Sequence, residues 1–248
     1  MKIAVQFAGN LPRDLAEVWY KNVRKHMDCP IVHLTDMETE PLAFADEVQR
    51  VDEPDICAAK FTHLSMLRGN VLNLDYDTLV QRDVSDVFNK RFDVALTKRN
   101  WKDDTKKLLY LMSPHNTGVV FTRNPNFWAD CLKRYRLYPP NKQWMVGQVC
   151  ITEFANIYKN KYKVIEIPAA LYNHTPKTRD EDVSNRYIVH YKGNKKHWML
   201  DTQEIFMEGH RVGMMAIGKT EITPDHPNFD EIVIEQAKLD ASRNVNHK

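Results

Sequence analysis

The sequence predicts an α/β fold: one domain whose mostly parallel central sheet is covered by helices on both faces. Short apolar runs typical of buried strands alternate with longer segments of helical periodicity. The connections between them are short, as in repeated βα units. A length of 248 residues with 43% apolar residues suits one large domain with its own core.

The first half of the chain supplies four predicted strands and two helices. Residues 2–8 form an apolar run, and a helical pattern reaching His26 follows Asp14, which we expect to be its N-cap. Gly69 should end the second helix. In order, the later elements are strands at residues 31–34 and 47–51, a helix at 56–68 and a strand at 71–74.

The second half is less regular. The pattern predicts a short helix at 84–88, strands at 92–96 and 117–121, helices at 126–138 and 146–158, and strands at 162–167 and 187–190. A charged loop or lid should fill residues 97–115. Periodicity weakens after Trp198, so we assign residues 1–198 to the domain and 199–248 to an extension with a helix at 229–242.

Composition gives no support to several functional classes. A formal charge of +2 gives no whole-chain argument for nucleic acid or membrane binding. No run is long enough to span a membrane, and the first strand passes too soon into polar sequence for a secretory signal, so we expect a cytoplasmic protein. The four scattered cysteines, without zinc spacing, should be reduced and mostly buried.

Two acidic residues, Asp75 and Asp77, follow the apolar strand at residues 71–74. Ligands of open α/β sheets bind at the carboxyl ends of the strands, and strand alternation would send both carboxylates to one side. Such a pair can hold a hard divalent cation. In isolation, an exposed acidic turn is the simpler interpretation, so the motif gains its weight from its position.

A second polar segment ends the predicted strand at residues 187–190. His190 could complete a metal site with the distant carboxylates. Gly193 would let the backbone approach a phosphate closely, and Lys196 would supply a point charge for it. Together the two segments predict a cation that neutralises a diphosphate leaving group.

These motifs resemble those of a known family, the retaining GT-A glycosyltransferases of the glycogenin and lipopolysaccharyl galactosyltransferase type, called glycosyltransferase family 8. The resemblance covers about residues 2–198. Its most specific element is His-x-x-Gly-x-x-Lys-x-Trp, here from His190 to Trp198, downstream of the acidic pair. It implies a GT-A fold, a UDP-sugar donor, and Mn²⁺ or Mg²⁺ held by Asp75, Asp77 and His190.

The resemblance also implies roles for other residues on the donor side. Lys196 and the backbone of Gly193 would hold the diphosphate, and Lys60 would contact the donor. The remaining nucleotide contacts, which include the uridine site, would come from Phe7, Ala8, Asn10 and Tyr76.

Near the transferred sugar the sequence both matches and departs from the family. Asn116 lies in a segment similar to Asn-Ser/Ala-Gly-Val, which implies a place beside the sugar. Gln148 corresponds to the glutamine of an Asp-Gln pair beside the anomeric carbon, but Gly147 replaces the aspartate. The usual preference for glucose or galactose therefore does not transfer. Glu153 and Asp130 stay open as alternative carboxylates near the reaction.

The interpretation is a metal-dependent, retaining hexosyltransferase that uses a UDP-sugar. Its acceptor hydroxyl could belong to a glycan, which we favour, a lipid-linked saccharide, a protein or a modified nucleobase, the last because residues 98–107 mix cations with an aromatic ring. One rival is a nucleotidyltransferase. Such an enzyme usually needs a glycine-rich basic loop after its first strand, but residues 9–13 hold only one glycine. The other is a non-catalytic protein that binds nucleotide sugars.

Overall fold

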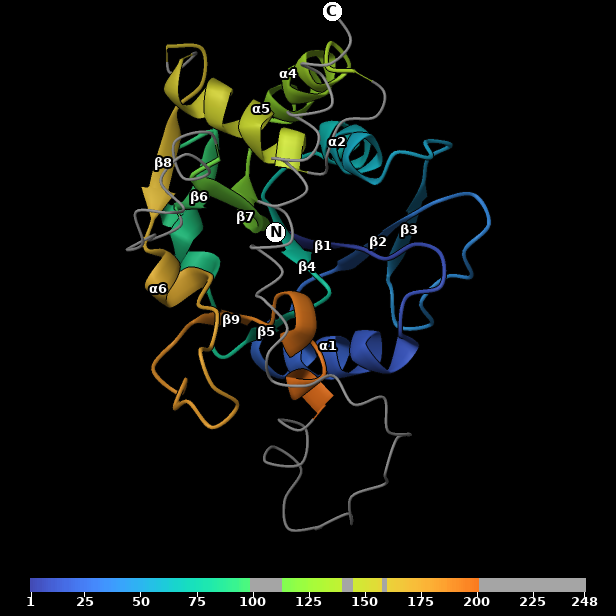
Figure 1. Cartoon of the computed structure of the whole chain (residues 1–248), viewed down its shortest axis with the longest axis vertical. Coiled ribbons are helices and arrows are strands. Elements are labelled where there is room, and N and C mark those ends of the chain that lie inside the picture. Colours follow the sequence, from blue (N-terminus) through green and yellow to red (C-terminus); the bar gives the residue numbers. More distant parts are fainter. Residues whose placement is uncertain (99–112, 140–144, 158–159, 201–248) are drawn as a thin grey trace, which may run out of the picture.

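The computed structural model of the chain describes residues 1–98, 113–139, 145–157 and 160–200. Among these, seven strands form one sheet in the order β3-β2-β1-β4-β7-β6-β8 (Figure 1). Their bounds are β1 Lys2–Gln6, β2 Ile31–Thr35, β3 Glu47–Arg50, β4 Val71–Asp75, β6 Val94–Lys98, β7 His115–Thr122 and β8 Val164–Ile167. A second, two-stranded sheet pairs β5 (Thr78–Val80) with β9 (Ile188–His190).

Helices cover both faces of the large sheet, as predicted. On one face lies α1 (Arg13–His26), and on the other lie α2 (Ile56–Met66), α4 (Asn126–Tyr135) and α5 (Met145–Asn156) (Figure 1). Each face has its own apolar cluster, one built on Trp19 and the other on Trp128, both fully buried. The short helix α6 (Ala169–Tyr172) and the small sheet belong to the face of α1.

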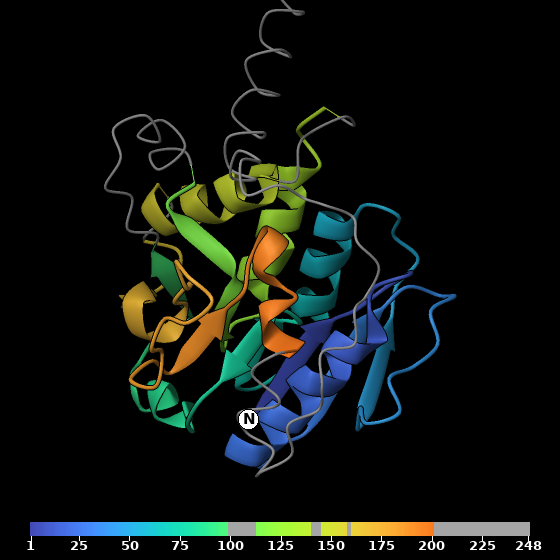
Figure 2. The ribbon, with the colours of Figure 1, turned by 60° about the horizontal axis from the view of Figure 1, so that its bottom comes forward.

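Strand direction is parallel throughout the large sheet except at β7. This strand runs antiparallel to both β4 and β6, while β6 pairs with β8 in parallel. The predicted mostly parallel sheet is therefore confirmed. Because β7 is reversed, its first residues, and not its last, meet the carboxyl end of β4. The segment that contains β9 and ends at residue 200, orange in both views, lies beside α1 (Figure 2).

Most predicted elements agree with the structure within a few residues, with three differences. The predicted cap Asp14 is wrong, because the N-cap of α1 is Pro12, two residues earlier. Asp14 lies in the first turn, where its Oδ1 accepts from the backbone N–H of Leu15. The predicted helix at 84–88 is a 3-10 turn, η1 (Ser85–Asn89). Neither β5 nor α6 was predicted, because each is only three or four residues long.

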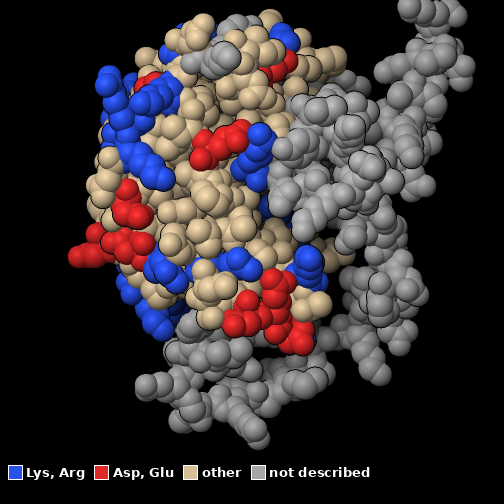
Figure 3. All heavy atoms as spheres, turned by 90° about the vertical axis from the view of Figure 1, so that its left-hand side faces the viewer, with Lys and Arg blue, Asp and Glu red and all other residues tan. Residues whose placement is uncertain are grey.

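Several other expectations can be compared with the described residues. Their four cysteines are free, and all except the half-buried Cys57 are buried. No described helix is both long and apolar enough to cross a membrane. Small groups of acidic and basic side chains alternate on the face in Figure 3, in line with the nearly balanced charge.

Most of the expected loop at 97–115 and the helix at 229–242 lie outside the described residues, while Met199 is buried in the core.

The start of α2 depends on one carboxylate. Asp55 accepts hydrogen bonds from the backbone N–H groups of Cys57 and Ala58, at 2.9 and 3.0 Å, and from the buried hydroxyl of Tyr135 on α4. Asp55 therefore both caps α2 and joins two helices. This matters for the site, because α2 carries Lys60.

We expect Asp55→Ala to lower the free energy of unfolding by about 2 kcal/mol, since it removes a helix cap and the carboxylate that accepts from the buried Tyr135 hydroxyl. The matched control Tyr135→Phe keeps the cap and should cost only about 1 kcal/mol. Urea unfolding followed by circular dichroism measures both. Equal losses in the two variants would contradict the capping role.

Candidate functional site

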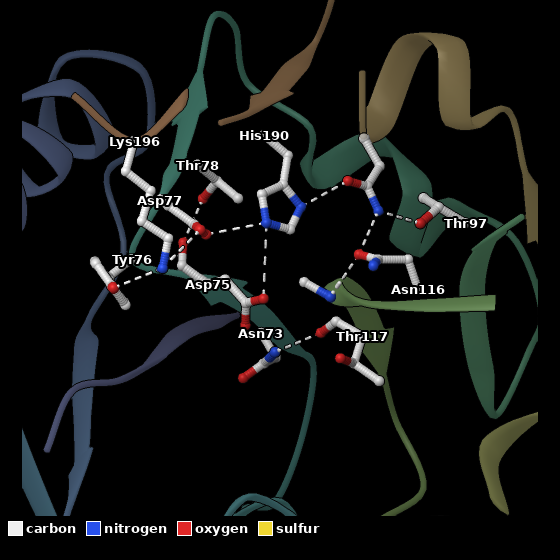
Figure 4. Close-up of polar contacts among 12 residues, drawn as sticks. Asn73, Asp75, Tyr76, Asp77, Thr78, Thr97, Asn116, Thr117, His190 and Lys196 are labelled. Carbon is white, nitrogen blue, oxygen red and sulfur yellow. Dashed lines mark hydrogen bonds and ion pairs between the residues drawn. The ribbon is translucent and has the colours of Figure 1, made fainter. Parts of the chain in front are cut away.

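Strand pairing brings the two predicted motifs together. The central strand β4 ends at Asp75, and the chain turns through Tyr76 and Asp77 directly into β5. In the small sheet Thr78 lies opposite His190, and the backbone N–H of Tyr191 donates to the Asp77 carbonyl at 2.8 Å. The imidazole and both carboxylates therefore face one another (Figure 4).

The three predicted metal ligands form one compact group. Their ligand atoms all lie within 4.8 Å of one another. His190 Nε2 is 3.0 Å from Asp77 Oδ1 and 3.8 Å from Asp75 Oδ2. The carboxylates converge because of the turn after β4, and not because of strand alternation as expected. Asp77 is also only 5% exposed, far more buried than a residue at the end of a strand need be.

The residues fit a divalent cation on two structural grounds. Asp77 Oδ1 is buried and has no hydrogen-bond partner among the described residues, which is costly for a carboxylate oxygen without a cation. Gly118 of β7 leaves the space beside the ligands open, since a Cβ there would lie 2.1 Å from His190 Cε1 and 2.8 Å from Asp75 Oδ2. Two carboxylates and an imidazole are ligands that bind divalent cations.

Each carboxylate of the pair also has a lysine partner. Lys60 of α2 contacts Asp75 Oδ1 at 2.7 Å, and Lys196 contacts Asp77 Oδ2 at 3.4 Å. Burial alone would raise the pKa of the Asp77 carboxyl, but His190 and Lys196 outweigh it and hold that pKa below its ordinary value. Burial lowers the pKa of His190, which favours the neutral imidazole that binds metal. Of these two neighbours of Asp77, Lys196 is therefore the one that stays positively charged when the imidazole is neutral.

Lys196 joins the acidic motif to the predicted nucleotide side. Its Nζ donates to the Tyr76 hydroxyl at 2.8 Å and lies 4.7 Å from the centre of that ring. Burial lowers the pKa of Lys196, but Asp77 and Tyr76 raise that pKa by more than burial lowers it, so the net shift is upward. The ring of Tyr76 packs edge-on against Phe7, which follows β1. Gly193 precedes Lys196 with φ of 60°, a conformation that side chains oppose.

The other predicted donor-side residues follow β1. Phe7 is buried, Ala8 is half-buried and Asn10 is exposed, in the loop that follows β1. His33 fixes the start of this loop, since its Nε2 bonds to the Phe7 carbonyl at 2.7 Å while its Nδ1 accepts from the backbone N–H of Leu42. Phe7 is thereby held beside Tyr76 of the acidic turn. The contacts of Phe7, Ala8 and Asn10 with uridine stay a prediction.

The predicted sugar-side residues occupy β7 and α5. Asn116 is buried near the start of β7, and Gln148 is buried in α5. A Cβ at Gly147 would lie 3.5 Å from the Phe61 ring and 3.6 Å from Cys57 Sγ, ordinary contacts that leave room for a Cβ. Their roles at the sugar stay predictions.

The two alternative carboxylates have structural partners. Asp130 contacts Lys161 and the hydroxyl of Tyr162, while Glu153 forms an ion pair with Arg134 at 2.6 Å. Neither is part of the group of potential metal ligands.

Sequence analysis missed a bulge beside the acidic pair. Leu96 pairs with Val120, but the next residue of β6 pairs with Asn116, so β7 bulges at residues 117–119. Side chains satisfy the backbone there. Lys60 and Asn73 donate to the Thr117 carbonyl at 3.1 and 3.3 Å, and the Gly118 N–H donates to Asn116 Oδ1 at 2.9 Å. No signal in the sequence marks this bulge except the glycine.

No protein-family model and no curated protein matches the sequence. Among solved structures, a glycosyltransferase involved in the glycosylation of the major capsid of PBCV-1 is 15% identical with a TM-score of 0.55, over 83% of this chain and 100% of the other. The galactosyltransferase LgtC, solved with donor and acceptor sugar analogs, is 14% identical with a TM-score of 0.52, over 78% and 88%.

A third solved structure, the glycosyltransferase GlyE of Streptococcus pneumoniae, is 13% identical with a TM-score of 0.55, over 79% of this chain and 55% of the other. At identities this low, the likeness is evidence about the fold alone. These three neighbours are all glycosyltransferases. The predicted resemblance is therefore confirmed at the level of the fold: the chain has the GT-A fold of glycosyltransferases.

Proposed function

We propose that the protein is a metal-dependent, retaining glycosyltransferase that moves a hexose from a UDP-sugar to an acceptor hydroxyl. The observation that supports this most is the convergence of Asp75, Asp77 and His190 beside Lys196 at the carboxyl end of β4. A divalent cation and a lysine together match the charge of a diphosphate. The likeness in fold to glycosyltransferases supports the same proposal.

The chemistry rests on departure of the leaving group. When bound by Asp75, Asp77 and His190, Mn²⁺ or Mg²⁺ would act as a Lewis acid for the diphosphate. Lys196 stabilises the negative charge that grows on the β-phosphate as the bond between C1 and oxygen breaks. The acceptor oxygen then bonds to C1 from the face being vacated, and its proton passes to the departing β-phosphate oxygen of UDP, so that configuration is retained.

Two buried amides complete the sugar side of this proposal. Gln148 of α5 lies beside the anomeric carbon, and Asn116 of β7 lies near the sugar ring. Neither amide can act as a strong nucleophile, so the proposal requires no covalent intermediate on the protein. A glycan is the favoured acceptor, and a hydroxymethylated nucleobase is the alternative that the acceptor experiment also covers.

One experiment separates the proposal from its two rivals. The protein is incubated with Mn²⁺ and a panel of UDP-sugars, and separately with nucleoside triphosphates and sugar phosphates. Slow release of UDP without an acceptor supports the transferase. Release of pyrophosphate identifies a nucleotidyltransferase, and binding without any release identifies a non-catalytic protein. Mass spectrometry of glycans and of modified DNA then identifies the acceptor.

Asp77→Asn should weaken Mn²⁺ binding by at least tenfold, because an amide is a poorer ligand than a carboxylate for a hard cation. The fold should persist, since the substitution removes a buried charge without changing side-chain size. Electron paramagnetic resonance of free Mn²⁺ measures the affinity, and circular dichroism reports the fold. The control Asp83→Asn removes an exposed carboxylate from a nearby turn and should bind Mn²⁺ like the wild type. Wild-type Mn²⁺ affinity in Asp77→Asn would refute the metal site.

Lys196→Ala should lower kcat more than it raises the KM for the donor, because the charge on the phosphate grows toward the transition state. The expected loss is about 3 kcal/mol, roughly a hundredfold in rate. Lys195→Ala is the matched control: it removes the same charge one residue away, where Nζ donates to the Pro176 carbonyl. An unchanged kcat in Lys196→Ala would limit this lysine to binding the donor.

The absence of a carboxylate at Gly147 should make discrimination between UDP-glucose and UDP-galactose weak. Gly147→Asp should sharpen it by about tenfold or more, because a hydrogen bond to a charged group contributes about 1.5–3 kcal/mol. Gly147→Ala is the control for bulk, since a Cβ fits the space beside Phe61. Steady-state kcat/KM for both donors is the measurement. A wild-type preference above about a hundredfold would defeat this idea.

A further inference from the structure

An asparagine that sequence analysis did not identify contacts the predicted metal ligand His190. Asn173 directly follows α6 and is only 5% exposed. Its Oδ1 lies 2.8 Å from His190 Nδ1, and its Nδ2 lies 2.6 Å from Thr97 Oγ1 and 2.9 Å from Asn116 Oδ1. Backbone bonds hold it in register, because the N–H of His190 donates to the carbonyl of His174 at 2.7 Å.

The orientation of both amides follows from a single backbone N–H. The Gly118 N–H can only donate, so the Asn116 atom that receives it at 2.9 Å must be its oxygen. The Asn173 atom facing that oxygen must then be a donor, which makes it the NH₂ group. The oxygen of Asn173 is therefore the atom that faces His190. A flipped Asn173 would set two acceptors against each other at Asn116.

The same logic reaches the imidazole. Since an amide oxygen only accepts, Nδ1 of His190 must carry the proton. In the neutral ring Nε2 is then unprotonated, and its lone pair faces the carboxylates, 3.0 Å from Asp77 Oδ1. Three electron-rich atoms directed at one point repel one another in the absence of a cation, and they are the arrangement that a divalent cation needs. Figure 4 shows the imidazole between the carboxylates and the asparagine network.

We propose that Asn173 is a positioning residue that holds the imidazole of His190 in the tautomer that presents Nε2 to the cation. The Gly118 N–H fixes the orientation of the Asn116 amide, and Asn116 in turn fixes the orientation of the Asn173 amide. Asn173 does not touch the cation or the donor. Asn116 takes part through its Oδ1, in addition to its proposed place near the sugar. The role in metal binding rests on the proposed function, whereas the tautomer is a property of the metal-free protein.

The test reads the tautomer directly. Protein with ¹⁵N-labelled histidine is studied without metal at about pH 8, above the ordinary histidine pKa. Long-range ¹H–¹⁵N spectra report which ring nitrogen carries the proton, and the signal missing from His190→Gln identifies His190 among the ten histidines. The wild type should show the proton on Nδ1. A proton on Nε2 would overturn the proposal.

Three variants isolate the contribution of Asn173. Asn173→Leu has a similar volume but no acceptor, so His190 should lose its single tautomer and Mn²⁺ affinity should fall by about tenfold or more. Asn173→Asp keeps an acceptor facing Nδ1, so the proton should stay on Nδ1, while the loss of the NH₂ donor to Asn116 Oδ1 should lower the melting temperature. Thr97→Val removes a different hydrogen bond of Asn173 and should leave the tautomer unchanged.

The outcomes separate this inference from the proposed function. If Asn173→Leu keeps the wild-type tautomer, or changes only the melting temperature, Asn173 is merely structural and the proposal fails. A tautomer that responds as expected supports the positioning role even if Mn²⁺ does not bind the wild type. That last result would refute the proposed metal dependence instead.

Discussion

The pairing of β5 with β9 is the constraint on which the site depends. Each strand has only three residues, yet their register places His190 opposite Thr78 and so beside Asp77. The small sheet is held by the core on the face of α1, where Leu79, Val80 and Val189 are buried. Apolar packing thus sets a polar geometry, because a shift of one residue would turn His190 away from the carboxylates.

Charge in the site is balanced before any ligand arrives. Asp75 and Asp77 are each paired with one lysine, and burial favours a neutral His190. A divalent cation would make the group positive, which is the charge that a diphosphate needs. The balance also explains how the Asp77 carboxylate tolerates a buried position in the metal-free protein, where an unpaired charge would be costly. Lys60 and Lys196 therefore stabilise the fold and prepare the site at once.

The sequence was informative wherever function depends on local pattern. Apolar runs predicted the strands that end at the site, and the polar residues after them predicted the group of potential metal ligands. It was uninformative where position depends on tertiary pairing. Asp77 is buried because β5 follows it immediately, and Asn173 matters only because β9 returns beside it. Three-residue strands and a bulge in β7 have no periodicity to detect, so their consequences could not be foreseen.

The ligands of the proposed cation come from both sheets. Asp75 ends a strand of the large sheet, whereas His190 ends a strand of the small one. Asp77 lies in the turn that joins β4 of the large sheet to β5 of the small one. A cation held by all three would act as a non-covalent crosslink between the two sheets. Its binding free energy would then add to the attachment of the small sheet, by about 2.7 kcal/mol at a concentration of about a hundred times Kd. Catalytic readiness and the mechanical integrity of this part of the fold would rise and fall together.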